Sequence, residues 1–422
     1  MNAFMNIVVS SVITCVRGTI RHLGIRETVN QQSTFAMVLT NYPCGTLMPE
    51  NLSAELNAVR SAMQTFVDEI VLPSATSADQ AEASVRVREA SKQAGFFYKT
   101  QPESYGGDPA STLELTVLRE QLAAANTPQS RAVFGPGPGI LHSAEGRLKT
   151  DYLDPVLRGE KRGSFGFTEP DTAKRPSYGV LNDGQITITG QKSYVTGGQD
   201  ADFVSALINI EDPNGEKLGT AMVVIDLDLE GVELSDVFSS LDGSGHVSIT
   251  FNSVLVPEAC MVGKPGEGMP RALGNIGNVR LMVSAEAMGI CLWVLDFVEQ
   301  HLKAPHRSGT PLADKEVVRL RFADMRIQTY AARSVLYRAA RMVDSGTNAV
   351  NETIAAKVFC TETAGNVVDW GVQLVGGQAL VQGHPLEALY RRVRAFRFVE
   401  GASDLLRLNL AKGKLELGKG TV

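Results

Sequence analysis

Beyond the first fifty residues, apolar side chains recur every three or four positions, which is the spacing of amphipathic helices. Ser53 can cap a first helix, which we expect to end before Pro73. A second helix is predicted from Asp79 to Gly95, and a third over 112–125. This part of the chain therefore predicts a helical domain.

The hydrophobic period changes to two between Gly163 and about Pro257. The segment Asn182-Asp183-Gly184 is typical of a hairpin turn, and it leads into a stretch where Ile186 and Ile188 alternate with threonines. A pattern of this kind is typical of strands with one buried face. We expect a compact antiparallel β domain in the middle of the chain.

The pattern becomes helical again after Gly268 and stays so. Three-four spacing continues from Phe322 to Val343, which predicts a long bundle helix. Further helical stretches are predicted over 269–302, 351–374 and 386–412. The C-terminal part therefore predicts a four-helix bundle.

The order of these patterns predicts an α+β multi-domain fold, and 422 residues are too many for one ordinary core. We place an extension or targeting segment, expected to be poorly ordered, before an N-terminal helical domain, a central antiparallel β domain and a C-terminal helical bundle. The predicted boundaries are 1–48, 49–162, 163–268 and 269–422.

Composition excludes several function classes. Hydrophobic residues make up 44% and charged residues 20% of the chain, close to the globular average. The net charge of −6 comes from 40 basic and 46 acidic residues without a basic stripe, so we expect no nucleic-acid partner. We also expect no membrane span, because we find no uninterrupted apolar run of about 18 residues.

The short motifs of the sequence indicate neither a metal site nor a dinucleotide-binding site. The five cysteines are far apart and form no C-x-x-C pair, which favours reduced core thiols over disulfides or zinc. The chain has no H-E-x-x-H, no G-x-S-x-G and no G-x-G-x-x-G after a strand. We therefore expect no metal site.

The first 48 residues differ from the rest. Arg17, Arg21 and Arg26 occur there without an acid before Glu27, beside the apolar stretch 7–16. This composition suits an organelle transit segment, a weak secretory signal or an unstructured upstream tail. We expect a cytoplasmic protein, or a mitochondrial matrix protein if the segment is a transit peptide.

Five ordered motifs resemble the acyl-CoA dehydrogenase family over roughly residues 50–415. They are FGFTEP at 165–170, GQKSYVT at 190–196, GKPGEG at 263–268, QLVGG at 373–377 and YRRVRAFRFVEG at 390–401. The resemblance implies an FAD flavoprotein, an oxidoreductase of fatty acid or acyl-thioester metabolism that acts on CH–CH groups. The family's helical, β, helical order agrees with the order found above.

The resemblance also implies which residues contact the cofactor and the substrate. The cofactor-binding residues would be Phe165, Phe167, Thr168, Tyr194, Thr196, Gln373, Gly376 and Gly377. Hydroxyls and backbone amides can bind the polar edge of a flavin while aromatic rings exclude water. The substrate-binding residues would be Lys174, Arg280 and Gly401.

Glu400 aligns with the family's catalytic base. In the implied reaction, this carboxylate removes the α-proton of an acyl thioester while flavin N5 takes the β-hydride, which makes a 2,3-double bond. A desolvated Glu with a raised pKa suits this role. Without the alignment, a Glu after an arginine-rich helix would be read as a surface ion pair.

The sequence departs from the family pattern at several positions. The small-residue segment that usually follows T-E-P is bulkier and basic here, at 171–175, and Gly277 stands where an acid is expected. The R-x-x-F-G segment is replaced by 305–309, and Ala402 replaces a threonine. We therefore expect either an acyl-CoA or an acyl-carrier-protein thioester as substrate.

Two other functions stay open at this point. One is a flavin monooxygenase on the same fold, and the other is a non-catalytic relative. The resemblance further implies an electron-accepting flavoprotein as partner and a homo-oligomer, dimer or tetramer.

Overall fold

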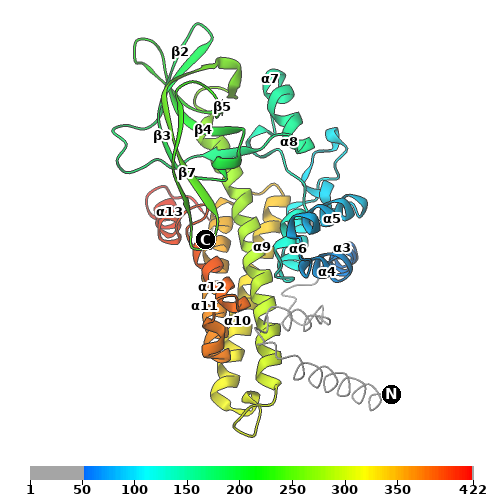
Figure 1. The fold of residues 1–422 in the computed structure, drawn as a ribbon. Coiled ribbons are helices and arrows are strands. Elements are labelled where there is room, and N and C mark those ends of the chain that lie inside the picture. The colour runs from blue at the N-terminus through cyan, green and yellow to red at the C-terminus, as the bar shows by residue number, and fades with distance from the viewer. Residues whose placement is uncertain (1–51, 421–422) are drawn as a thin grey trace, which may run out of the picture. The chain divides into compact units, whose positions relative to one another are not determined.

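The computed structural model describes residues 52–420, shown in Figure 1. The predictions for residues 1–48, and those for Cys15 and Cys44, lie outside this range. The remaining three cysteines, Cys260, Cys291 and Cys360, are free and buried, as predicted for core thiols.

Short helices make up the N-terminal part. They are α3 (Ala54–Phe66), α4 (Leu72–Ala75), α5 (Gln80–Gln93), α6 (Thr112–Ala123), α7 (Gly146–Leu148) and α8 (Asp154–Arg158). The Ser53 hydroxyl accepts a hydrogen bond from the Leu56 N–H, and the Asp79 carboxylate accepts one from the Glu82 N–H. The predicted cap at Ser53 and the predicted helix start at Asp79 are therefore confirmed.

The expected helix end before Pro73 is wrong. A π-helical turn, Val67–Val71, joins α3 to α4, and the Leu72 N–H donates to the Val67 carbonyl five residues back. Pro73 then falls in the first turn of α4, where a missing N–H costs little. The wider turn therefore lets the chain continue as a helix through the proline.

The central part is one eight-stranded sheet. Its strands are β1 (Gly163–Gly166), β2 (Tyr178–Asn182), β3 (Gln185–Thr196), β4 (Phe203–Glu211), β5 (Lys217–Asp226), β6 (Val232–Ser239), β7 (Gly245–Pro257) and β8 (Met261–Val262). Their order is β6-β7-β3-β2-β4-β5-β8, with β1 also paired to β4.

The sheet is mixed, so the prediction of an antiparallel domain needs correction. β2 and β3 form the predicted antiparallel hairpin, with Asp183 and Gly184 at positive φ in the turn. β1 and β2, however, both pair with β4 in parallel. Parallel pairing joins strands that are distant along the chain, so it could not be predicted from the alternation of apolar residues within each strand.

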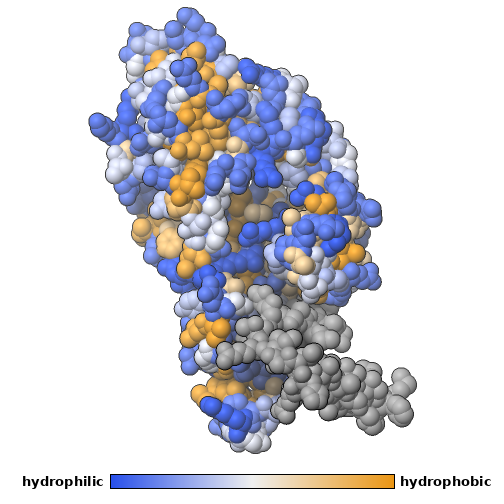
Figure 2. All heavy atoms as spheres, in the orientation of Figure 1, coloured by the Kyte–Doolittle hydropathy of each residue, from blue (hydrophilic) through white to orange (hydrophobic). Residues whose placement is uncertain are grey.

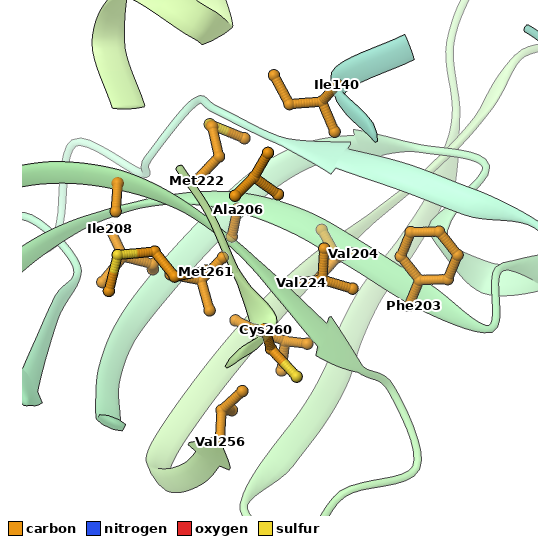
Figure 3. Close-up of a cluster of buried hydrophobic side chains, with 14 of the residues drawn as sticks. Ile140, Phe203, Val204, Ala206, Ile208, Met222, Val224, Val256, Cys260 and Met261 are labelled. Atoms are coloured by element: carbon orange, nitrogen blue, oxygen red, sulfur yellow. The ribbon is translucent and has the colours of Figure 1, made fainter. Parts of the chain in front are cut away.

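One apolar core lies on the sheet and extends into the preceding helices. In Figure 3, Val204 and Ala206 of β4 lie beside Met222 and Val224 of β5, and Ile140 belongs to the same cluster. Figure 2 shows that apolar side chains also form a band on the surface of the β domain. The sheet and the N-terminal helices therefore share buried surface.

The C-terminal part is a helical bundle. Its helices are α9 (Gly268–Lys303), α10 (Glu316–Asp344), α11 (Val350–Val375), α12 (Pro385–Phe396) and α13 (Ser403–Leu415). The predicted long helix over 322–343 is confirmed as part of α10. The predicted stretch 386–412 is wrong as one helix, because the chain leaves the helix between α12 and α13.

α9 is long and apolar enough to cross a membrane by length and composition, but 78% of that stretch is buried within the protein. Such burial is typical of a core helix. The order of N-terminal helices, central sheet and C-terminal helices confirms the predicted α+β fold class.

A buried ion pair joins α6 to α10. Arg333 donates from Nε and Nη2 to the Glu120 carboxylate at 2.8 and 2.7 Å, and the Tyr337 hydroxyl donates to the same carboxylate at 2.7 Å. The Asp344 carboxylate also accepts from the N–H groups of Thr112 and Leu113 at the start of α6. The first domain is thus bound to the bundle by charged groups as well as by apolar packing.

Candidate active site

Glu400 lies in the loop between α12 and α13. It has φ of +55°, which is uncommon for a residue with a side chain, and Gly401 follows at +108°. The Gly401 N–H donates to the Phe398 carbonyl at 3.1 Å, and the Ser403 N–H donates to the Arg397 carbonyl at 2.9 Å. These bonds close a tight turn and hold the uncommon backbone conformation.

Two buried cations hold the carbonyl groups of this turn. Arg280 of α9 donates from Nε to the Glu400 carbonyl at 3.0 Å. Lys357 of α11 donates from Nζ to the Gly401 carbonyl at 2.8 Å. Both bonds reach main-chain oxygens, so the turn is fixed by its backbone while the Glu400 side chain is left out of the anchoring.

The Glu400 carboxylate makes no hydrogen bond or ion pair within residues 52–420. Burial raises the pKa of this carboxyl, against the opposing effect of Arg280 and Lys357. Burial and the charge of Arg280 together lower the pKa of Lys357 to about 8. Burial also lowers the pKa of Arg280. A desolvated carboxylate without a partner is a suitable proton acceptor.

The structure brings the two predicted flavin segments side by side. The Phe165 and Phe167 rings stack with centroids 6.1 Å apart. The Thr168 carbonyl accepts from the Ser193 N–H of β3 at 2.9 Å. Glu169 fixes the contact further, because its carboxylate binds the Lys192 ammonium at 2.6 Å.

Tyr194 and Thr196 follow directly on β3. Tyr194 is 64% exposed at φ of +53°, and its ring contacts the Phe238 ring edge-on at 5.4 Å. The Thr196 hydroxyl lies 3.1 Å from His246 Nδ1. Phe238 and His246 were not predicted, because the β6–β7 hairpin that carries them has no motif of its own.

These residues fit a flavin ring. The Ser193 hydroxyl is buried and has no hydrogen-bond partner among the described residues, beside the exposed Tyr194 ring and the exposed Thr168. Free hydroxyl groups next to exposed aromatic surface are what a flat heterocycle with a polar edge requires. Phe165, Phe167, Thr168 and Tyr194 could therefore line one side of such a ring.

Gln373, Gly376 and Gly377 lie elsewhere in this chain. Gln373 is 16 residues beyond Lys357 on α11, which is about 24 Å along the helix axis. The structure therefore does not bring them together with Glu400. Lys174 is exposed and makes no hydrogen bond or ion pair within residues 52–420, so it also stands apart.

Lys357 is the site residue that sequence reasoning missed. It stands in the apolar run Ile354 to Cys360 and is fully buried. A single lysine in such a run is a usable signal, because a buried ammonium needs an acceptor. The identity of that acceptor, 44 residues away, could not be read from the sequence.

The chain thus combines a helix, sheet, helix order with a half-buried carboxylate that has no partner in residues 52–420 and with a separate group of residues that fits a flavin ring. Two family profiles match the chain in the same order: "Acyl-CoA dehydrogenase, N-terminal domain" over 53–160 and "Acyl-CoA dehydrogenase, C-terminal domain" over 266–415. The chain belongs to the acyl-CoA dehydrogenase family.

Known relatives match most of this chain. The short-chain specific acyl-CoA dehydrogenase of Clostridium acetobutylicum is 26% identical over 385 residues, covering 87% of this chain and 100% of that protein. The caffeyl-CoA reductase-Etf complex subunit CarC of Acetobacterium woodii is 26% identical over 325 residues, covering 74% and 85%. An acyl-CoA dehydrogenase of Bacillus anthracis, solved in complex with FAD, has the same fold, with a TM-score of 0.73 and 23% identity, covering 88% and 68%.

Proposed function

We propose that this chain is an FAD-dependent dehydrogenase that forms the 2,3-double bond of an acyl-CoA or acyl-carrier-protein thioester, with Glu400 as the base. The observation that carries the proposal is the unpaired, desolvated Glu400 carboxylate in a turn fixed by Arg280 and Lys357. A base held by its backbone keeps its side chain free for the substrate.

FAD, when bound, supplies the acceptor for the hydride that leaves the β carbon. Phe165, Phe167, Thr168, Tyr194 and Thr196 would hold its ring. The aromatic residues exclude water from the reacting face, and the threonines can bind the polar edge. Gln373, Gly376 and Gly377 would reach a cofactor in a neighbouring copy, which supports a homo-oligomer, because the distance along α11 separates them from Glu400 in their own subunit.

Glu400 takes the α-proton onto its carboxylate, and the electron pair of the broken C–H bond becomes part of the new double bond. During this step the thioester oxygen gains negative charge. The Glu400 N–H makes no hydrogen bond within residues 52–420, so it is available to that oxygen. Gly401 supplies the positive φ of +108° that the turn beside Glu400 requires.

The free Glu400 carboxylate favours this proposal over its two alternatives. A flavin monooxygenase needs no base for an α-proton, and a non-catalytic relative has no use for a carboxylate kept without a partner. The electrons would pass to an electron-accepting flavoprotein, which fits the similarity to a subunit of an Etf complex. We propose the cytoplasm as location, or the mitochondrial matrix if the first residues are a transit segment.

Anaerobic titration with a series of acyl-CoA thioesters tests the proposal. The flavin absorbance of the native protein should bleach, and Glu400→Gln should bleach at least a hundredfold more slowly with the same flavin content. Glu416→Gln is the matched control, because Glu416 is exposed after α13 and should bleach at the native rate. Equal bleaching by Glu400→Gln would show that the assigned base is wrong.

A further inference from the structure

One face of α9 stays partly exposed although its neighbours are fully buried. Asn275, Val279, Met282 and Glu286 recur at three-four spacing along this face, and all four are half-buried. The adjoining Ile276, Val283 and Ala287 are buried. A continuous half-buried stripe on a core helix indicates the floor of a cleft. Figure 2 shows that the molecule is hollowed between the β domain and the helices around α6.

Two elements form the walls of this cleft. A Cβ on Gly139 would lie 3.8 Å from the Asn275 side-chain oxygen, which places the loop 134–139 beside the start of the stripe. Arg119 of α6 stacks over the Phe134 ring of the same loop at 5.4 Å. On the other side, Arg392 of α12 binds the Glu286 carboxylate at 2.5 Å.

The charges at this end of the cleft do not balance. Glu286 is paired with Arg392, and Arg119 makes no hydrogen bond or ion pair within residues 52–420. Burial lowers the pKa of Arg119 to about 10, although the charge of Glu286 acts in the opposite direction. A half-buried guanidinium with an aromatic contact but no anion of its own has the properties of an anion-binding group.

We propose that the acyl group of the substrate ends in a carboxylate, and that Arg119 binds it. The inference rests on the proposed function, since it names the class of acyl thioester that the same site takes. Glu286 lies six residues beyond Arg280, about 9 Å further along α9. Arg280 donates to the Glu400 carbonyl, so the Glu286 end of the stripe lies beyond the Glu400 turn by this distance along the helix axis.

Glu286 sets the selectivity of this arrangement. Its carboxylate neutralises Arg392, so the Arg119 guanidinium is the positive charge that is left for the substrate. A neutral acyl end would leave the Arg119 guanidinium desolvated without compensation, which disfavours simple fatty acyl groups.

The test compares monothioesters of four- to six-carbon dicarboxylic acids with neutral acyl-CoA thioesters of the same length. The native protein should favour the carboxylated series in kcat/KM. Arg119→Met should lower that preference about 10- to 100-fold, the range expected for a hydrogen bond to a charged group. Glu286→Gln should raise the preference, and Arg119→Lys should keep part of it. Arg88→Met, at an exposed position on α5, is the matched control and should change nothing.

A second readout measures binding without turnover. Calorimetry with a 3-thia analogue of the carboxylated thioester, which has no hydrogen on the third position, should show weaker binding by Arg119→Met at unchanged flavin content. Equal use of both series by the native protein, or the same preference in Arg119→Met, overturns the inference and leaves the proposed function intact. Flavin that neither series bleaches contradicts the proposed function itself.

Discussion

Removing one partner of the buried ion pair between Arg333 and Glu120 should destabilise the protein strongly, and Arg333→Met tests this. Both side chains are at most 4% exposed. Removing one partner leaves the Glu120 charge buried, which typically costs about 3–5 kcal/mol. The Tyr337 hydroxyl still donates to that carboxylate and offsets about 1 kcal/mol. We therefore expect a loss of about 2–4 kcal/mol in the free energy of unfolding.

The assay is guanidinium denaturation followed by circular dichroism. Arg333→Met/Glu120→Leu should recover most of the loss, because no buried charge remains in the double variant. The control is Arg158→Met, which removes an ion pair with Glu160 whose side chains are more than half exposed and should cost no more than about 1 kcal/mol. A double variant as unstable as the sum of both single variants would refute the reasoning.

Three further predictions concern the Glu400 turn. Burial raises the pKa of Glu400 and the base acts when ionised, so the rate of flavin reduction by acyl-CoA should rise with pH along a titration limb centred above the ordinary pKa of 4.5. The contribution of Glu400 to the free energy of unfolding should fall over the same pH range. A limb centred at 4.5 in stopped-flow rate profiles would contradict this. Lys357→Met removes a nearby positive charge, so that limb should move to higher pH; an unmoved limb would show that Lys357 does not act on the base. Gly401→Ala should lower the free energy of unfolding by about 1–3 kcal/mol, measured by thermal melting, because φ is +108° and the new Cβ would lie 3.1 Å from Leu406. Gly274→Ala is the control and should not destabilise the protein, because Gly274 lies on α9 with open space around it.

Local signals in the sequence were enough to predict many elements. Ser53 and Asp79 predicted two helix starts, and the turn at Asp183-Gly184 predicted the β2–β3 hairpin, because each depends on a few neighbouring residues. The order of helices, sheet and helices followed from the change of hydrophobic period.

Features set by distant contacts could not be predicted. The three-four pattern runs from Val393 and Phe396 to Leu406, so it gives no sign of the break that places Glu400 in a turn. That break is held by Arg280 and Lys357, which lie on other helices. The parallel pairing of β1 with β4 has the same cause, because it joins segments about 40 residues apart.

The two anchoring cations have a consequence for how this site can change over time. Since Arg280 and Lys357 bind main-chain carbonyl oxygens, neither of these two bonds depends on the side chain at position 400. A different reactive side chain introduced at position 400 by mutation would be held by the same two bonds to the backbone of the turn. Descendants of such a chain could therefore exchange the reactive group in a single step without first rebuilding the bundle.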